Sequence, residues 1–320
     1  MSPSSRVLPA QVARPGLRSR RLMHSLPAWA GGLLLAAAMA TPGFFSVPNL
    51  VALAGTLSLI GCVAVGMTFI TMSGNVMSFA LGATCAATSM ITAHYSALGM
   101  GAALSAGLSF AVLYSALQGW LIGVFRANSL IVSIAALTLL GGVAQYLSQG
   151  QSLYAAGDTL VFFRQRVGGV PVSLFVLLLV AACSHWALRR TRFGHQVVLI
   201  GSNADAAAVA GLPVVRCLAA SYGVAGLCAG VAGVLVAARF GSGTMEYGIG
   251  LDYSAISAVL VGGTAIGGGS GSVLRTLIGG LVIAVLQSLL LLHGLDTQYQ
   301  YLLIGIIVLL AIVIQYKGAK

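Results

Sequence analysis

Residues 50–72 read LVALAGTLSLIGCVAVGMTFITM, 23 positions without a charged side chain. They lie inside a longer run, from Leu22 to Phe125, in which 104 residues pass without Asp, Glu, Lys or Arg. A helix that crosses the hydrocarbon core of a bilayer needs about 20 consecutive apolar residues. The run therefore has room for several spanning helices, and it predicts an all-α polytopic membrane protein.

The rest of the chain repeats this pattern in shorter units. Five later charge-free runs are 20 to 22 residues long, and a sixth covers residues 127–157. The composition agrees, because 58% of the residues are hydrophobic, only 7% are charged and the mean hydropathy is +1.00. A soluble domain carries about a quarter charged residues. The composition thus excludes an ordinary soluble domain.

Turn-forming residues divide the long first run into four helices. Proline lacks the amide that a helix interior needs, and glycine favours turns. The interruptions fall at residues 41–49, 73–75 and 94–101. Ten helices are predicted in all, at residues 27–44, 50–72, 76–94, 100–123, 129–148, 171–188, 217–238, 254–266, 273–292 and 299–316. They form a single membrane domain, residues 27–316, between a basic tail (1–26) and a short end (317–320).

The basic residues predict the orientation of these helices, because Lys and Arg concentrate in cytoplasmic loops. With a cytoplasmic amino terminus, 13 of the 16 fall inside, and Arg164, Arg166 and Arg239 remain outside. Both termini are therefore expected in the cytoplasm, and the net charge of +11 is attributed to topology and anionic lipid rather than to nucleic acid. The alternative is a cleaved secretory signal at the start. Its removal would leave nine spans and put the basic loops on the wrong side.

The sequence shows no catalytic or metal-binding pattern. The glycine-rich residues 262–271 lack the Gly-Lys-Ser/Thr of a phosphate-binding loop, and the only lysines are Lys317 and Lys320. All five acids fall in predicted loops or at helix ends, so no site for proton or sodium coupling is visible. Energy is expected from another subunit. The 42 glycines are assigned to close helix packing, with small-xxx-small pairs at Gly119/Gly123, Gly226/Gly230 and Gly263/Gly267.

The largest predicted cytoplasmic loop, residues 189–216, contains a short helix. Asn203 is a suitable N-cap, Asp205 in the first turn suits the helix dipole, and Gly211 with Pro213 ends the helix. Two turns, about 10 Å, are far too short to span a membrane. This element is either an interfacial linker or a rigid peg that fits a groove on a cytoplasmic partner.

Several separated motifs resemble one family. Phe193-Gly194, Gly201, Asn203, Ala206 and Gly211 resemble the cytoplasmic loop of ABC-importer permeases of the ribose, arabinose and xylose family, and residues 128–131, 169–172, 256–264 and 296–301 match it further. The resemblance implies a sugar importer built from two permeases, a cytoplasmic ABC ATPase that uses ATP and Mg, and an extracytoplasmic sugar-binding protein. No cofactor is expected in this chain. The residues expected to face the ATPase are Arg192, Phe193, Asn203, Asp205, Ala206 and Gly211.

Two further sets of residues are candidates for the transport path and for outer docking. A neutral polyol needs hydroxyl and amide partners, and those predicted near the path are Thr68, Thr71, Ser73, Asn75, Ser78, Gln145 and Ser257. The default role of such intramembrane hydroxyls is a bond to their own helix. The acids expected to receive the binding protein are Glu246, Asp252 and Asp296, and simple solvation is the alternative for each.

The chain also departs from that family. Val76 stands where the family usually has Asp, and Ala204 stands where a Glu often follows the loop asparagine. Sugar preference and ATPase pairing are therefore expected to differ. The remaining alternatives are a permease for another small solute, such as branched-chain amino acids, and, from a different class, an ion-coupled carrier or a non-transporting scaffold.

Overall fold

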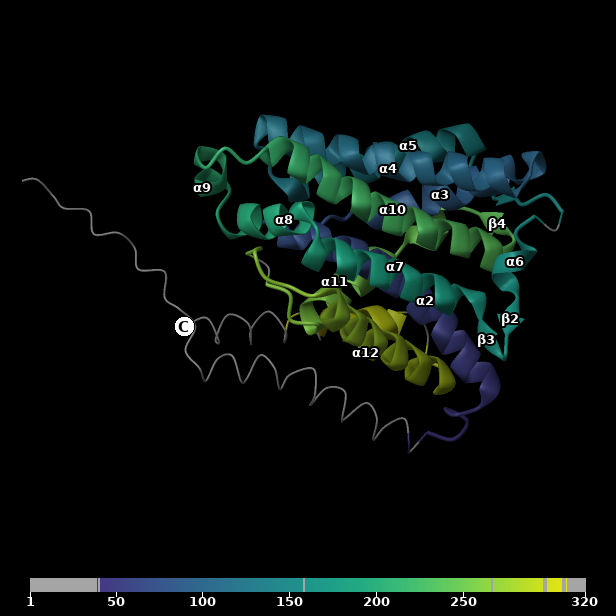
Figure 1. The fold of residues 1–320 in the computed structure, drawn as a ribbon. Helices are drawn as coiled ribbons and strands as arrows, with labels where there is room; N and C mark the ends of the chain where they lie inside the picture. The colour runs from purple at the N-terminus through teal and green to yellow at the C-terminus, as the bar shows by residue number, and fades with distance from the viewer. Residues whose placement is uncertain are drawn as a thin grey trace, which may run out of the picture.

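The computed structural model describes residues 39, 41–157, 159–265, 267–295, 298–306 and 309. These residues form a bundle of helices with two small pairs of strands at its periphery (Figure 1). Most of the predicted first helix, both terminal segments and the end of the last helix lie outside the described residues. Residues 41–46 form turns, so no helix extends to residue 44 as predicted; Gly43, at φ 83°, takes a conformation that does not continue a helix.

Among the described residues, six helices are long and apolar enough to cross a membrane. They confirm six of the predicted spans to within a few residues, and residues 298–306 are helical where the last one was expected to begin. The all-α membrane class is therefore confirmed. The six are α2 (Val47–Met72), α4 (Met100–Phe125), α5 (Ser129–Ser148), α7 (Val172–Arg190), α10 (Val214–Phe240) and α12 (Val273–Leu292).

Shorter elements connect these helices. The strands pair antiparallel, β1 (Leu153–Tyr154) with β4 (Ser242–Gly243) and β2 (Arg166–Val167) with β3 (Val170–Pro171). The remaining elements are α3 (Leu81–Tyr95), η1 (Ser96–Leu98), α6 (Val161–Arg164), α8 (Arg192–Ser202), α9 (Ala204–Val209), η2 (Met245–Gly248) and α11 (Leu251–Val261). α9 lies at one end of the bundle, whereas α6 and the β2–β3 pair lie at the other (Figure 1).

The centre of the bundle is α10, which packs against α2, α3 and α4. Two predicted glycine pairs mediate the α4–α10 contact. A Cβ at Gly119 would come within 2.7 Å of the Leu218 carbonyl oxygen, and one at Gly226 would overlap the backbone of Ala111. Helices in a bilayer gain no hydrophobic free energy by associating, so close backbone packing of this kind is what holds them together. The third pair was wrong, because Gly263 ends a turn after α11 at φ 73° with no neighbour within 4 Å of an added Cβ.

Two interruptions within the bundle set the geometry of the site. Residues 73–80 separate α2 from α3, which confirms the predicted discontinuity, but α3 begins at Leu81 rather than at residue 76. A second interruption, residues 241–250, lies within the non-helical stretch predicted between residues 238 and 254. It leaves α11 with 11 residues, about 16 Å, which is half of a bilayer core. Non-helical backbone at such depth is tolerated only against protein or a wet cavity.

Candidate functional site

The short helix α9 forms as the sequence predicts. Its N-cap is Asn203, whose side-chain oxygen accepts a hydrogen bond from the Ala206 amide at 2.9 Å. Asp205 lies in the first turn, and Gly211 beyond the end has φ 80°. Arg126 is the ion-pair partner of Asp205 at 3.8 Å, but both side chains are more than four-fifths exposed. An exposed pair of this kind contributes little to stability.

Most residues of α9 are exposed, and Asp205 is the charged residue among them. Of the predicted docking residues in this region, Asn203, Asp205, Ala206 and Gly211 are all exposed, whereas the neighbouring Ala207 is 6% exposed and packs inward. Val209, whose side chain is 90% exposed, was not among the residues predicted from the sequence. A lone valine in a run of alanines was the available signal.

The preceding helix, α8, was not predicted, and it connects α9 to the bundle. Its apolar side chains Phe193, Val197 and Ile200 recur with helical spacing and lie in one buried cluster. The ring of Phe193 stacks on Phe69 of α2, with centroids 6.3 Å apart. Phe193 therefore anchors α8 rather than facing outward, while Arg192 is exposed. The 3.6-residue periodicity of the three side chains could have revealed this helix.

The end of α8 meets the first interruption through four glycines, which we name the glycine junction: Gly74, Gly201, Gly268 and Gly269. A Cβ at Gly268 would lie 2.5 Å from the Gly74 Cα and 2.7 Å from the Gly201 carbonyl oxygen, and one at Gly201 would overlap the Met72 carbonyl oxygen. The Gly269 amide donates a hydrogen bond to that same oxygen at 3.1 Å. Three segments distant in sequence thus touch by backbone alone, which only glycine allows.

The candidate path residues fall into two groups. Thr68, Thr71 and Ser257 are fully buried, and each donates a hydrogen bond to a carbonyl of its own helix. This is the default role of intramembrane hydroxyls. Thr68 also bonds Thr276 of α12 at 2.8 Å, which ties two spans together. Gln145 is exposed on α5.

The second group lies at the interruption itself. The Ser73 hydroxyl donates to Ile70 at 2.7 Å and receives a hydrogen bond from the Asn75 amide at 3.1 Å, while Ser78 is buried. Asn75 also lines a cavity of about 790 Å³ between the end of α4, α9 and the start of α10. Among the path candidates, Asn75 therefore shares an open cavity with α9.

The acids predicted to dock a binding protein are placed differently from one another. Glu246 is exposed on η2, and Asp296 lies outside the described residues. Asp252 is 8% exposed, and its carboxylate accepts a hydrogen bond from the Gly82 amide at 2.6 Å. This corrects its expected position on the outer surface. Asp252 instead satisfies a free amide at the start of α3, an interaction that suits the positive end of a helix.

The Asp252 contact joins the two interrupted segments, so its loss should destabilise the bundle. Asp252→Ala leaves the Gly82 amide without a partner, and we expect a loss of about 2 kcal/mol of stability. Asp252→Asn keeps an acceptor oxygen and should lose less than half of that. Thermal unfolding of the detergent-purified variants measures both. Glu246→Ala, on the exposed part of the same segment, is the control, and equal midpoints for all three variants would contradict this role.

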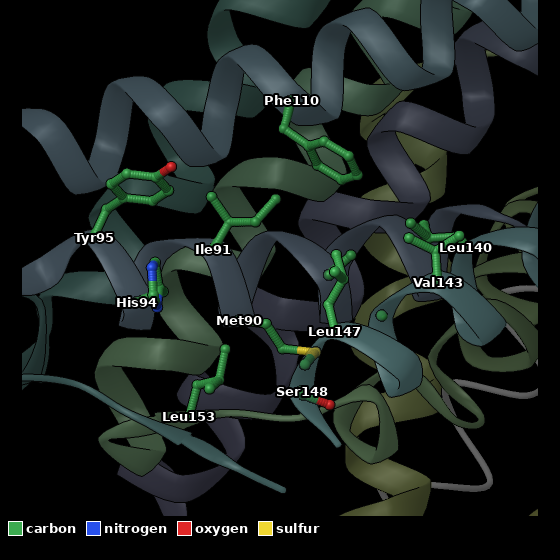
Figure 2. Close-up of a pocket in the computed structure, with 12 residues that line it drawn as sticks. Met90, Ile91, His94, Tyr95, Phe110, Leu140, Val143, Leu147, Ser148 and Leu153 are labelled. Atoms are coloured by element: carbon green, nitrogen blue, oxygen red, sulfur yellow. The ribbon is translucent and has the colours of Figure 1, made fainter. Parts of the chain in front are cut away.

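Another pocket, of about 340 Å³, lies between α3, α4 and α5. Figure 2 shows Met90, Ile91, Phe110 and Leu147 gathered around it, with His94 and Tyr95 at its edge. Such an apolar lining offers few hydrogen-bond partners for a polyol. The pocket therefore does not suit a sugar site.

The fold is that of a multi-pass membrane protein, and the family that it matches consists of transport permeases. Residues 49–312 match the family described as branched-chain amino acid transport system / permease component, and the chain belongs to this family. It is 32% identical over 288 residues to the L-arabinose ABC transporter permease protein AraH of Azospirillum brasilense, covering 87% of this chain and 83% of that protein. It is 29% identical over 294 residues to the ribose import permease protein RbsC of Escherichia coli strain K12, covering 89% and 91%. These relatives confirm the resemblance found in the sequence.

Proposed function

We propose that this chain is the membrane-spanning subunit of an ABC importer that moves a pentose-like monosaccharide. A separate ATPase docks at α9 and supplies the energy. The glycine junction is the observation that carries the proposal, because it joins the exposed α9 segment, through α8, to the interruption that holds Ser73 and Asn75. A displacement of α9 by a partner would reach the path by direct backbone contact. The transition is a rigid-body movement that opens one side of the path and closes the other.

The α9 end is assigned to the cytoplasm. The described arginines near this end include Arg126, Arg189, Arg190 and Arg216, as the positive-inside bias requires. With the first and last helices counted, ten spans place both termini on this side of the inner membrane. α9 is then the coupling helix of the loop 189–216. Arg192, Asn203, Asp205, Ala206 and Gly211 remain its proposed contact residues, with Val209 added.

A neutral sugar fits the interruption better than an amino acid. The relatives named above are permeases for arabinose and ribose, which supports a monosaccharide. The family description names branched-chain amino acids, and this is the second candidate. An amino acid needs partners for an ammonium and a carboxylate group, whereas Ser73, Asn75 and Ser78 are uncharged. Hydroxyl and amide groups match a polyol.

The other partners complete the importer. A second permease copy or a related permease forms the other half of the path, and an extracytoplasmic binding protein delivers the sugar opposite α9. Glu246 is the described acid that remains a candidate for that docking. ATP and Mg belong to the ATPase. An ion-coupled carrier is less well supported, since the buried Asp252 is already bonded to Gly82.

Reconstitution in vesicles tests this function. The chain is combined with the ATPase and the binding protein encoded by its neighbouring reading frames, and uptake of labelled ribose, arabinose and leucine is measured. We expect sugar accumulation that requires both partners and ATP. Leucine accumulation would favour the second candidate, and accumulation by the chain alone would favour a carrier. No uptake of any solute with all partners present would indicate a scaffold.

The role of Asn75 is tested in the same system. Asn75→Leu removes the amide that borders the cavity, and we expect sugar uptake to fall about tenfold, the loss of one or two hydrogen bonds to substrate. Val76→Leu, at the exposed neighbouring position, keeps the polar group and should leave uptake unchanged. Both variants should still co-purify with the ATPase. If Asn75→Leu transports as well as the unaltered chain, Asn75 is not part of the path.

A further inference from the structure

The three arginines that depart from the positive-inside bias meet at one place. Arg164 ends α6, Arg166 belongs to β2 and Arg239 lies in the last turn of α10. All three line a single pocket of about 370 Å³ at the end of the bundle opposite α9 (Figure 1). If these three arginines had no common role, we would expect them to lie at separate places on the surface. Their convergence indicates a site for a negatively charged group.

No carboxylate within the described part of the chain neutralises these arginines. The one ion pair among the described residues joins Arg126 to Asp205 near α9. The Arg239 guanidinium instead lies over the ring of Phe240, 5.6 Å from its centroid. Three guanidinium groups offer planar, paired donors that match the oxygens of a phosphate. The three arginines of the pocket are therefore suited to a phosphate group.

The rest of the pocket lining is mostly apolar. α2 lines it from Pro48 to Leu59, which is about 16 Å along the helix axis, and Leu235 of α10 lies on the other side. At Gly55 an added Cβ would lie 3.3 Å from the Arg239 guanidinium, so this group lies against α2 at Gly55. The pocket thus combines three arginines with an apolar groove that follows a spanning helix. A free anion would use the arginines alone.

We propose that this pocket binds a membrane phospholipid, with its phosphate on Arg164, Arg166 and Arg239 and an acyl chain along Ala52, Leu59 and Leu235. A phospholipid is favoured over an acidic side chain of a docking protein, since a side chain would leave the groove between α2 and α10 empty. The lipid belongs to the leaflet opposite α9. Its site is independent of the transported solute and of the α9 contact.

The test uses phosphatidylglycerol as the probe and native mass spectrometry of the purified full chain as the readout. The unaltered chain should retain phosphatidylglycerol in preference to phosphatidylcholine. The triple variant Arg164→Gln, Arg166→Gln, Arg239→Gln should lose that retention at least tenfold. Removal of three charges from the α9 end, with Arg189→Gln, Arg190→Gln and Arg216→Gln, should leave it in place.

A second variant keeps every charge and fills the groove. Ala52 is exposed and lines the pocket, so Ala52→Phe should fold and should also lower phosphatidylglycerol retention. Ala182→Phe, at an exposed position of α7 outside the pocket, is the matched control. If Ala52→Phe changes neither the binding of inorganic phosphate nor the retention of lipid, the pocket binds a free anion. That result would overturn the proposal. Loss of binding-protein association in the triple variant with lipid retention intact would overturn it in favour of a protein contact.

Discussion

Ala206→Arg combined with Val209→Arg is expected to abolish co-purification with the ATPase and, with it, sugar uptake. Both side chains are exposed on α9, and Val209 is 90% exposed. Arginine is a good helix former, so α9 should persist. Two long charged side chains would separate surfaces that must pack closely. The loss of a central contact costs about 2 kcal/mol or more, which is an affinity decrease of about 30-fold.

The controls for this prediction come from the same helix. Ala208 lines the cavity between α4, α9 and α10 and is not one of the proposed contact residues, so Ala208→Arg should leave ATPase association in place. Ala207 is unsuitable for arginine, because it is buried and its substitution would disturb α9 itself. Pull-down from solubilised membranes, with the amount of inserted permease as the reference, gives the readout. Unchanged association of the double variant would remove the docking role of α9.

The spans could be predicted from sequence because the bilayer imposes a simple rule, an apolar run of fixed length between charges. That rule gave α5 and α12 to the residue, at Ser129–Ser148 and Val273–Leu292. The same rule cannot place an interruption. The interruption contains Val76, Met77 and Phe79, which are as apolar as residues of a spanning helix. Hydropathy therefore cannot distinguish this non-helical segment from the helices beside it.

The positions of the site residues were predictable where the cause is local. Asn203, Asp205 and Gly211 act within one short helix, and the structure has that helix at the expected place. Asp252 could not be placed, because its partner Gly82 is 170 residues away. The glycine junction is of the same kind. Each of its glycines reads as an ordinary turn or packing residue until the three segments are brought together.

The second large effect is expected at Gly201. Gly201→Ala places a Cβ where the Met72 carbonyl oxygen lies, so the end of α8 must move away from the first interruption. We expect ATPase association to stay within about twofold, since the exposed tip of α9 is untouched, while sugar uptake falls at least tenfold. This lost transmission corresponds to about 1.4 kcal/mol or more. Uptake per ATP hydrolysed, measured in vesicles that contain all subunits, is the readout.

A control separates transmission from folding. Gly101→Ala, in α4, meets nothing within 4 Å and should leave uptake unchanged. Both variants replace a helical glycine, a change that by itself favours a helix by about 1 kcal/mol. A Gly201→Ala protein that loses both ATPase association and thermal stability would have a folding defect and would contradict the transmission role. Full uptake would contradict it as well.

We expect the glycine junction to move as one rigid unit during transport. A cross-link across the junction distinguishes this movement from one in which its segments separate. A Cβ at Gly269 would lie 3.0 Å from the Ser202 Cβ, within an ångström of the spacing of about 3.8 Å in a disulfide. Ser202→Cys with Gly269→Cys, with the exposed Cys183 replaced by serine, should therefore oxidise readily. Because Gly269 has φ 69° and an added Cβ also meets the Ser202 backbone at 3.0 Å, uptake by the oxidised protein is compared with uptake by the same variant in its reduced form. If α8 and the residue 268–269 segment travel together, the oxidised importer keeps its uptake. If oxidation stops uptake and a reductant restores it, the junction separates during transport, and α9 must act on the path by another route.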